Sequence, residues 1–415
     1  MLRVYFKTFG CRTNIYDTEL LKSYIKNYEI INDESLADII VVNSCTVTNG
    51  ADSGVRNYIN SMRNSGKKVV LTGCGAVSKG LELYKNSAIF GVLGASNKDK
   101  IDEMLSKNEP FYELGDLNFI DKNIVSNYEN HTKAFIKIQE GCDFSCSYCI
   151  IPSVRGLSRS IDESVILNEA RILANNGYSE IVLTGTNIGS YGKGSSTTLG
   201  KLLSNLGKIN GIKRIRLGSI EPSQIDESFK EILREPWLER HLHIALQHTS
   251  QDMLTIMNRR NRALRDLDLF CELSSMGFAL GTDFIVGHPG ETPKIWDEAL
   301  ENFIKFPLTH IHAFIFSPRS GTKSATMAID VDPKTAKERL KTLQNIVAKN
   351  NLKFRLENCD KPLEVLVEKS CDENLYEGWD QYYNKIKIKS DKNISKEWIN
   401  IKNYEITQDF NYAQI

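Results

Sequence analysis

Three cysteines lie close together near the middle of the chain. Cys142, Cys146 and Cys149 follow the pattern C-x-x-x-C-x-x-C, directly after an apolar run that is typical of a strand. Three thiolates on one tight loop can bind three irons of a four-iron, four-sulfur cluster, which leaves the fourth iron without a protein ligand. Such an iron is chemically useful, because it can bind a small molecule.

Two other kinds of site would explain part of this motif. Structural zinc takes four ligands, commonly as two separated pairs, and neither a fourth cysteine nor a histidine follows here at finger spacing. Cys146 and Cys149 alone could form a redox pair, but this interpretation leaves Cys142 without a role. We therefore favour the iron–sulfur cluster.

A second set of three cysteines is spread over the first part of the chain. Cys11, Cys45 and Cys74 each follow a short apolar run that predicts a strand. The runs lie at residues 4–6, 37–43 and 68–73. Apolar runs of this kind favour a parallel sheet covered by helices, and strands about 5 Å apart can bring loops at one sheet edge together. Buried structural cysteines remain the alternative, because free cysteine is often buried.

Elements that alternate between strand and helix must position the central motif. Six strands are predicted, at residues 134–138, 180–184, 214–217, 243–246, 281–286 and 310–316. Helical patterns lie between them, such as residues 162–176 with Asp162 as N-cap and Gly177 as stop signal. This alternation predicts an open or partial (β/α) barrel, whose working face lies at the C-terminal ends of the strands.

The whole chain is therefore predicted to be an α/β protein of three domains. Residues 1–125 form the N-terminal parallel α/β domain, with a helix expected over 17–28, and a polar linker follows at 115–131. Residues 133–355 form the partial barrel, closed by a helix over 333–351. Residues 358–415 contain period-two strands, which predict a small C-terminal β-barrel of the OB-like kind.

Composition excludes several classes of protein. The 415 residues include 52 Lys and Arg against 52 Asp and Glu, so a polycationic nucleic-acid binder is excluded. Hydrophobic residues make up 41% and no run approaches about 18 apolar residues, so we expect neither general disorder nor a membrane helix. The first residues lack the features of a signal peptide. We expect a cytoplasmic protein whose nine cysteines are ligands or bystanders rather than disulfides.

The central motif resembles that of radical S-adenosylmethionine enzymes, and the continuation at 150–160 narrows the resemblance to the methylthiotransferases. The resemblance covers essentially the whole chain, as an N-terminal three-cysteine domain, a radical domain and a C-terminal TRAM domain. Four strings are similar to the tRNA threonylcarbamoyladenosine methylthiotransferase branch. They are TFGCRTN at 8–14, LTGTNIG at 183–189, RIRLGSIEP at 214–222 and FSPRSGT at 316–322.

The resemblance implies two 4Fe–4S clusters, one held by Cys142, Cys146 and Cys149 and the other by Cys11, Cys45 and Cys74. It implies that S-adenosylmethionine binds the first cluster and yields a radical. The expected reaction adds a methylthio group to C2 of N6-threonylcarbamoyladenosine at position 37 of tRNA. The expected partners are the tRNA anticodon loop and an electron donor such as flavodoxin or ferredoxin.

Three alternatives to this substrate and activity stay open. Sister branches of the family act on isopentenyladenosine in tRNA or on a ribosomal-protein aspartate. A non-catalytic iron–sulfur regulator that binds RNA belongs to a different class. The chain departs from the family pattern at Phe144, at His288 and at residues 248–250, which affects loop details. We expect His248 and His288 to have structural roles.

Several residues at strand ends are candidates for binding the cofactor. Gly185 would let the methionyl amino group approach the backbone, Arg216 would pair with the carboxylate, and Glu221 would accept bonds from a ribose or amino group. Barrel-rim ion pairs are the alternative for both charged residues. Arg155 is expected to shape the site with its fixed charge. The complete predicted set for the cofactor is Thr184, Gly185, Arg216, Glu221, Gln247 and Val286.

The C-terminal segment carries the predicted RNA-binding residues. Lysines on one strand face, preceded by aromatic residues, could contact phosphates and stack on bases. A charged edge strand that prevents aggregation is the alternative. The residues are Tyr382, Tyr383, Lys385, Lys387 and Lys389.

Overall fold

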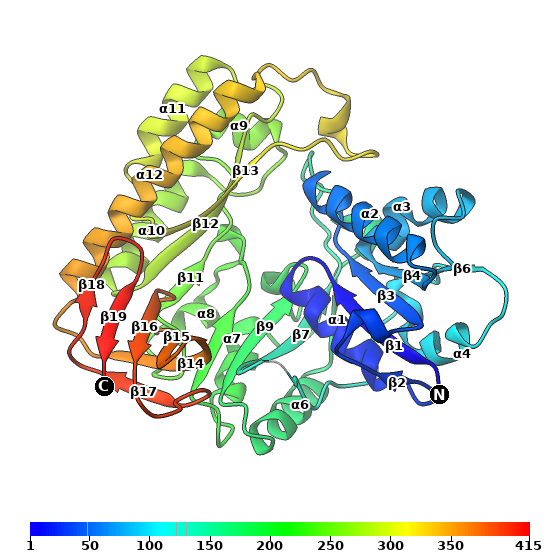
Figure 1. The fold of residues 1–415 in the computed structure, drawn as a ribbon. Coiled ribbons are helices and arrows are strands. Elements are labelled where there is room, and N and C mark those ends of the chain that lie inside the picture. The colour runs from blue at the N-terminus through cyan, green and yellow to red at the C-terminus, as the bar shows by residue number, and fades with distance from the viewer. Residues whose placement is uncertain (48, 122, 130) are drawn as a thin grey trace.

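A computed structural model describes residues 1–47, 49–121, 123–129 and 131–415. The chain forms three segments (Figure 1), of which the first and last contain one sheet each and the central one contains two. The predicted α/β architecture is confirmed, with a parallel N-terminal sheet, an open barrel in the centre and a curled C-terminal sheet. Among the described residues, no helix is both long and apolar enough to cross a membrane.

The N-terminal sheet has six parallel strands in the order β2-β1-β3-β4-β5-β6. All six residues of its central strand β3 are buried, which explains why four of them are Ile or Val, whereas the last two are the polar Asn43 and Ser44. The strands are β1 (Arg3–Thr8), β2 (Glu29–Ile30), β3 (Ile39–Ser44), β4 (Lys68–Gly73), β5 (Gly91–Leu93) and β6 (Phe111–Glu113). The helices are α1 (Arg12–Ser23), α2 (Asn49–Asn64), α3 (Cys74–Lys85) and α4 (Ile101–Leu105).

Helix α1 corrects one prediction. It begins five residues earlier than the expected helix over 17–28, because the chain turns into the helix directly after Cys11. Tyr16 and Leu20 on this helix are packed into the core of the barrel segment rather than into the N-terminal sheet alone. Figure 1 shows α1 between the N-terminal strands and β7 (Ala134–Glu140). The helix therefore joins the first two segments.

The central segment is an open barrel of parallel strands. It consists of two sheets, in the orders β10-β9-β7-β8 and β11-β12-β13, which are linked by an isolated bridge between Ile220 and Ile244. The further strands are β8 (Arg159–Ser160), β9 (Glu180–Gly185), β10 (Arg214–Leu217), β11 (His241–His243), β12 (Ala279–Val286) and β13 (His310–Ile315). Only the short β8 runs antiparallel to its neighbour, β7.

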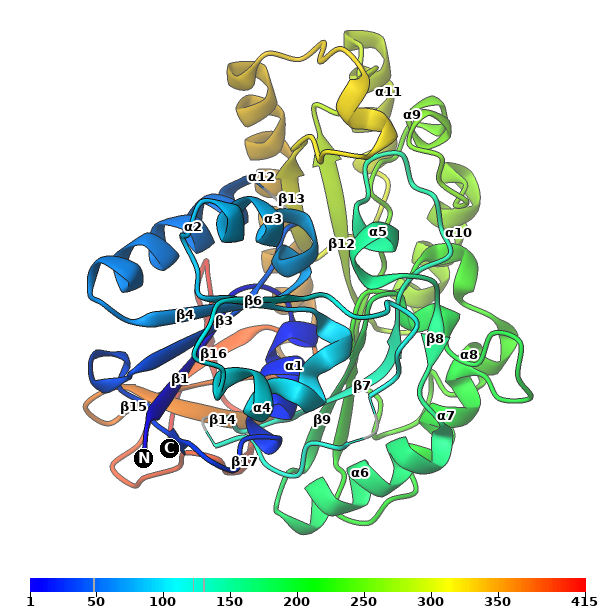
Figure 2. The same cartoon turned by 90° about the vertical axis from the view of Figure 1, so that its right-hand side faces the viewer.

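Helices cover the outside of these strands (Figure 2). They are α5 (Ile151–Arg155), α6 (Glu163–Asn175), α7 (Leu199–Leu206), α8 (Glu227–Glu231), α9 (Gln251–Ile256), α10 (Ala263–Ser275), α11 (Pro293–Phe303) and α12 (Pro333–Glu357). The fourth strand was predicted at 243–246 and lies at 241–243 instead. The backbone departs from extended geometry at Gln247, which has a φ of 68°, so its side chain is turned at the barrel rim.

The predicted linker at 115–131 includes residues 122 and 130, which lie outside the described residues. The described part from 115 to 129 contains neither helix nor strand, as expected of a linker. It is nevertheless packed tightly, because Val125 and Tyr128 belong to the barrel core and Asp121 is buried. The segment therefore contributes to the core as well as joining the two sheets.

The C-terminal segment is a curled six-stranded sheet in the order β17-β14-β15-β16-β19-β18. Its strands are β14 (Leu363–Asp372), β15 (Leu375–Trp379), β16 (Lys385–Lys389), β17 (Trp398–Ile401), β18 (Glu405–Ile406) and β19 (Asn411–Gln414). The long helix α12 leads into it along the outside of the barrel (Figure 1). Along β16, Ile386 and Ile388 are buried, so the lysines between them face outward.

Candidate active site

The loop with the central cysteines begins where β7 ends. Gly141 has a φ of 75°, and a side chain there would overlap the carbonyl oxygen of Leu157. The amide of Cys142 then donates to the carbonyl of Gly156 at 3.0 Å, and the amide of Cys149 donates to the carbonyl of Cys146 at 3.1 Å. The glycine is therefore required for a loop tight enough to gather three thiols.

The second cysteine set lies at the C-terminal edge of the N-terminal sheet. Strands β1, β3 and β4 are neighbours in that sheet, and Cys11, Cys45 and Cys74 follow them. A Cβ atom at Gly10 would lie 2.5 Å from the Cβ of Cys45, so the first loop passes directly against the second. The predicted convergence of three loops at one sheet edge is present.

An arginine reaches one sulfur of each cysteine set. The Nε of Arg155 donates to the Sγ of Cys74 at 3.0 Å, and an Nη of Arg259 lies 3.7 Å from the Sγ of Cys146. Arg155 was predicted to shape the site, whereas Arg259 was missed. Arg259 lies after α9, more than a hundred residues beyond the cysteine motif. Only the fold brings its side chain to the cysteine loop, so no sequence spacing could indicate this contact.

Burial raises the pKa of four of the six cysteine thiols in the two sets, Cys45, Cys74, Cys142 and Cys149. It raises the pKa of Cys45 to about 11 and that of Cys149 to about 12. Burial also raises the pKa of Cys74, an effect that the charge of Arg155 opposes. Binding of iron must therefore displace protons from these thiols, as is usual for thiolate ligands.

A buried network of ion pairs holds the second cysteine set against the barrel. Arg155 contacts Asp17 at 2.7 Å and Glu140 at 2.6 Å, and Lys137 contacts Asp17 at 2.7 Å. Lys137 also contacts Asp121 at 2.5 Å. The network joins α1, β7 and the linker segment, so it fixes the position of the N-terminal cysteines relative to the central ones.

All six cysteines line one cavity of about 410 Å³. Three residues predicted to bind the cofactor, Gly185, Glu221 and Gln247, line the same cavity. Glu221 lies 3.5 Å from Arg259 and also caps a short helical turn at Ser223. The structure thus places both cysteine sets and part of the predicted cofactor site around a shared space. We call it the cysteine cavity.

A second cavity of about 290 Å³ adjoins Cys149. Tyr148, Ile285 and Phe316 form apolar walls, and Gln247 and Asp283 supply polar groups. Apolar walls with a few polar groups are typical of a site for a small organic ligand. Val286 is predicted to contribute its backbone to the cofactor site, and this stays a prediction. Its side chain is fully buried in the barrel core, and the side chain of its neighbour Ile285 lines the cavity.

The prediction for Arg216 also needs correction. Its guanidinium contacts Glu180 at 2.8 Å and Glu239 at 2.9 Å, and it donates to the carbonyl of Asp380 at 2.8 Å. The side chain is only 1% exposed. Arg216 therefore joins the barrel to the C-terminal segment, and all three nitrogens of its guanidinium already have partners, so it cannot bind the carboxylate of the cofactor. The ion-pair alternative for Arg216 is the one that the structure supports.

The predicted RNA-binding residues are divided between core and surface. Tyr382 is buried in the core of the C-terminal sheet, so its ring cannot stack on a base. Tyr383 instead stacks on Trp379 and His241, with ring centroids 4.7 and 5.1 Å apart. Lys385, Lys387 and Lys389 share the outer face of β16, where Lys389 is exposed and Lys387 lies over the ring of Phe410.

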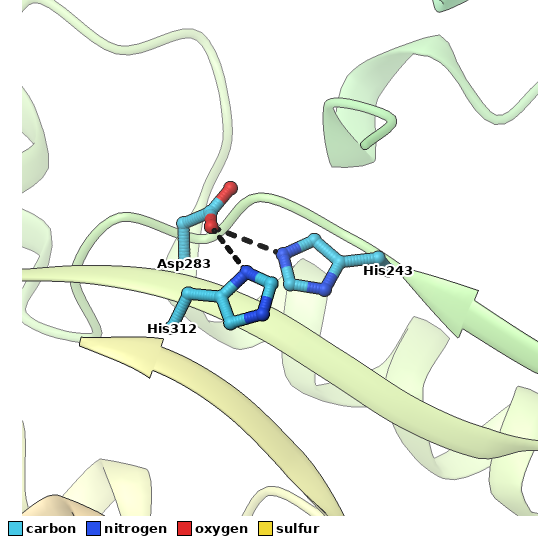
Figure 3. Close-up of side chains that lie close together, drawn as sticks. All are labelled: His243, Asp283 and His312. Atoms are coloured by element: carbon cyan, nitrogen blue, oxygen red, sulfur yellow. Dashed lines mark ion pairs between the residues drawn. The ribbon is translucent and has the colours of Figure 1, made fainter. Parts of the chain in front are cut away.

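A third cavity of about 420 Å³ is lined by residues from all three segments. It contains four histidines, from β11 and β13, and we call it the histidine cavity. They are His241, His243, His310 and His312. Figure 3 shows that His243 and His312 approach the same carboxylate oxygen of Asp283, at 3.1 and 3.6 Å. The side chain of Thr184 also lines it and contacts the hydroxyl of Thr13 at 3.0 Å.

The two remaining histidines of the barrel are structural, as expected. Both are fully buried. A ring nitrogen of His288 lies 2.8 Å from the hydroxyl of Ser324, and His248 lies 3.6 Å from Glu291. Neither lines the cysteine cavity or the histidine cavity.

The donor set can be compared with what an iron–sulfur cluster needs. All nine cysteines are free thiols, and each of the two sets supplies three of them to the cysteine cavity. Three thiolates per cluster is the number that leaves one iron open. The side chains present therefore fit two such groups, with an arginine near one sulfur of each set.

Known proteins match the chain along its whole length. Residues 3–94 match the uncharacterized protein family UPF0004, and residues 136–303 match the radical SAM superfamily. The chain is 47% identical over 417 residues to a Helicobacter pylori protein provisionally named a methylthiotransferase, with 100% of both chains covered. The chain belongs to the radical S-adenosylmethionine methylthiotransferase family. Members of this superfamily use a 4Fe–4S cluster and S-adenosylmethionine.

Relatives in this family carry different substrates in their names. The threonylcarbamoyladenosine tRNA methylthiotransferase MtaB of Aquifex aeolicus is 34% identical, over 88% of this chain and 93% of that protein. A tRNA-2-methylthio-N(6)-dimethylallyladenosine synthase of Wolbachia pipientis is 30% identical, over 98% of both. Among solved structures, the radical S-adenosylmethionine methyltransferase TsrM of Kitasatospora setae has the same fold, with a TM-score of 0.61, 15% identity and coverage of 78% and 77%.

Proposed function

We propose that this methylthiotransferase modifies C2 of N6-threonylcarbamoyladenosine at position 37 of tRNA, using two 4Fe–4S clusters and S-adenosylmethionine. The observation that carries the proposal is the cysteine cavity, which both cysteine sets line. When bound, the cofactors supply radical cleavage of an unactivated C–H bond and the sulfur and methyl group that replace it. Acid–base side chains could not remove such a hydrogen, because it is not acidic.

The residues of the chain have separate roles in this proposal. Cys142, Cys146 and Cys149 would hold the cluster that binds S-adenosylmethionine, and its nucleoside end would occupy the cavity between Tyr148 and Ile285. Gly185 lets a ligand approach the end of β9 without steric hindrance from a side chain. Arg155 and Arg259 are positioning residues whose positive charges lie beside cluster ligands.

The other cysteines, Cys11, Cys45 and Cys74, would hold the cluster that delivers sulfur. The target base has to reach the cysteine cavity, which lies between the N-terminal and central segments, and this requires the base to leave the stack of the anticodon loop. A single-stranded loop permits this at modest cost. Lys385, Lys387 and Lys389 on the outer face of β16 would contact phosphates of the same RNA.

The proposal includes an assignment of domains and surroundings. Residues 1–125, 133–355 and 358–415 correspond to a methylthiotransferase domain, a radical SAM domain and a TRAM domain. The enzyme would act in the cytoplasm, where tRNA is available, and would receive electrons from flavodoxin or ferredoxin. The choice of threonylcarbamoyladenosine rests on the four sequence strings and on the similarity to MtaB-type relatives.

Mass spectrometry of tRNA nucleosides tests this function. A deletion strain should lose 2-methylthio-N6-threonylcarbamoyladenosine and regain it when the gene is restored. The reconstituted enzyme, given dithionite and S-adenosylmethionine, should release 5′-deoxyadenosine and form the same nucleoside in tRNA. Loss of the isopentenyl product instead, or methylthiolation of a ribosomal protein, would contradict the substrate. Failure to release 5′-deoxyadenosine would point to a regulator without turnover.

A further inference from the structure

The histidine cavity and the cysteine cavity adjoin each other. They share five lining residues, namely Cys11, Thr13, Gly185, Ser219 and Asp283. In an adenine ring, C2 and C6 both flank N1, so a group attached to N6 leaves the ring on the same edge as C2. A base whose C2 lies in the cysteine cavity must therefore direct its N6 group into a neighbouring space, and the histidine cavity is such a space.

The fixed charge of the histidine cavity comes from Arg12. Among the described residues that line the cavity, Arg12 is the one arginine or lysine. Its guanidinium donates to the carbonyl of Leu217 at 3.3 Å and to the hydroxyl of Tyr383 at 3.0 Å. An arginine has five N–H donors, so these two bonds to neutral oxygens leave donors and a whole positive charge for a ligand.

The acidic side chains around this cavity are already compensated. Glu239 pairs with Arg216 at 2.9 Å, and Asp283 lies beside His243 and His312 (Figure 3). The neighbouring histidines hold the pKa of Asp283 below its usual range, which keeps its carboxylate ionised. The charge of Arg12 acts on Glu239 from a distance, but within the described part of the chain neither acid forms an ion pair with Arg12.

Two of the four histidines in the cavity are uncharged. Burial lowers the pKa of His310 to about 4 and lowers that of His241 well below its usual value, so both rings are neutral at neutral pH. The Nε2 of His241 is buried and has no hydrogen-bond partner among the described residues. Such an atom carries a desolvation cost that a ligand with a matching polar group would relieve.

We propose that the histidine cavity binds the N6 substituent of the target adenosine, and that Arg12 pairs with the carboxylate of that substituent. The inference rests on the proposed function and adds the residue that reads the amino-acid part of the substrate. One arginine with unused donors, next to neutral histidines, matches a substituent with one carboxylate, one hydroxyl and a carbamoyl group. An isopentenyl group would offer no polar partner to the unused donors of Arg12 or to the buried Nε2 of His241.

Binding measurements with matched RNA probes test the proposal without requiring turnover. The probes are two anticodon stem–loops, one with N6-threonylcarbamoyladenosine and one in which its carboxylate is replaced by a neutral carboxamide. The wild-type holoenzyme should bind the carboxylate probe about tenfold more tightly, as expected for a charge-assisted bond. In Arg12→Gln this preference should disappear, while affinity for the carboxamide probe should remain close to that of wild type.

Arg171→Gln is the matched control, because Arg171 is an exposed arginine on α6 outside the cavities described. It should keep the tenfold preference, and the iron content of both variants shows whether the clusters load. Because Arg12 follows Cys11, Arg12→Gln could fail to load iron, and the wild-type comparison of the two probes then still decides. Equal wild-type binding of the two probes would overturn the proposal, as would a preference retained in a loaded Arg12→Gln.

The outcomes also separate this inference from the proposed function. If the wild-type enzyme methylthiolates the threonylcarbamoyl and carboxamide probes equally well, the function stands and the role of Arg12 is wrong. If it methylthiolates an isopentenyladenosine probe and neither of the other two, the proposed function itself is wrong.

Discussion

The guanidinium of Arg155 bonds to the sulfur of Cys74 across the boundary between two segments. Arg155 belongs to the helix that follows the central cysteine loop, whereas Cys74 begins a helix of the N-terminal sheet. The same guanidinium pairs with Asp17 and Glu140, and all of these groups are buried. One side chain therefore sets the distance between the two cysteine sets and supplies positive charge to one of them.

Replacing Arg155 should damage both the fold and the second cysteine set. Arg155→Met removes a buried cation from Asp17 and Glu140 and leaves Lys137 and Lys98 to balance them, so the free energy of unfolding should fall by about 3 kcal/mol. Iron bound per chain should also fall. Arg159→Met is the control, since Arg159 is half-buried and donates only to carbonyl oxygens. Denaturant unfolding and iron content measure both effects, and wild-type values for Arg155→Met would contradict the interpretation.

Gly141 should be indispensable for the central cysteine loop. In Gly141→Ala the new methyl group would overlap the carbonyl oxygen of Leu157, and the residue would be strained at positive φ. We expect loss of the iron bound by Cys142 and its neighbours. Gly177→Ala also has positive φ but meets no atom within 4 Å, so it tests strain without overlap. Iron loss in both variants would assign the effect to strain alone.

Arg259 should raise the reduction potential of the cluster held by the central cysteines. Its positive charge lies beside Cys146 and favours the more negative, reduced state. Arg259→Met should lower the potential by on the order of tens of millivolts in a spectroelectrochemical titration. Arg260→Met is a close control, because Arg260 contacts the ring of Phe144 rather than a sulfur. An unchanged potential in Arg259→Met would refute this role.

Glu169 should make the protein less stable as the pH rises. Burial raises the pKa of this carboxyl to about 8, although it accepts a bond from the amide of Val125. Between its unfolded value of about 4.3 and pH 8, the folded state holds a proton that the unfolded state has lost, so stability falls across this window. Glu169→Gln keeps the acceptor and removes the titration. Its melting temperature should exceed that of wild type at pH 8 and approach it at pH 5.

The positions of the cysteines could be predicted because they depend on local signals. A strand end is visible as an apolar run that stops, and parallel strands carry their C-terminal loops to one edge. Cys11, Cys45 and Cys74 follow this rule, and the central motif is set by its own spacing. The helix after Cys11 was placed too late because the chain has no usual capping residue there.

The errors at Arg216 and Tyr382 have a different cause. The surroundings of each residue depend on which distant segment packs against it, and no local sequence pattern indicates that. Arg216 is satisfied by Glu239 and by the backbone of Asp380 in a distant segment, and Tyr382 is packed into the core of the C-terminal sheet. Arg12 and Arg259 were overlooked for the same reason, because their partners are brought together only by the fold.

The central claim is that two separate cysteine sets each bind a four-iron cluster at one cavity. Anaerobic iron and sulfide counts on the reconstituted protein test it most directly. Wild type should hold about eight irons per chain, and about four should remain when Cys142, Cys146 and Cys149, or alternatively Cys11, Cys45 and Cys74, are replaced by alanine. Zinc in place of iron, or about four irons in wild type, would contradict the account.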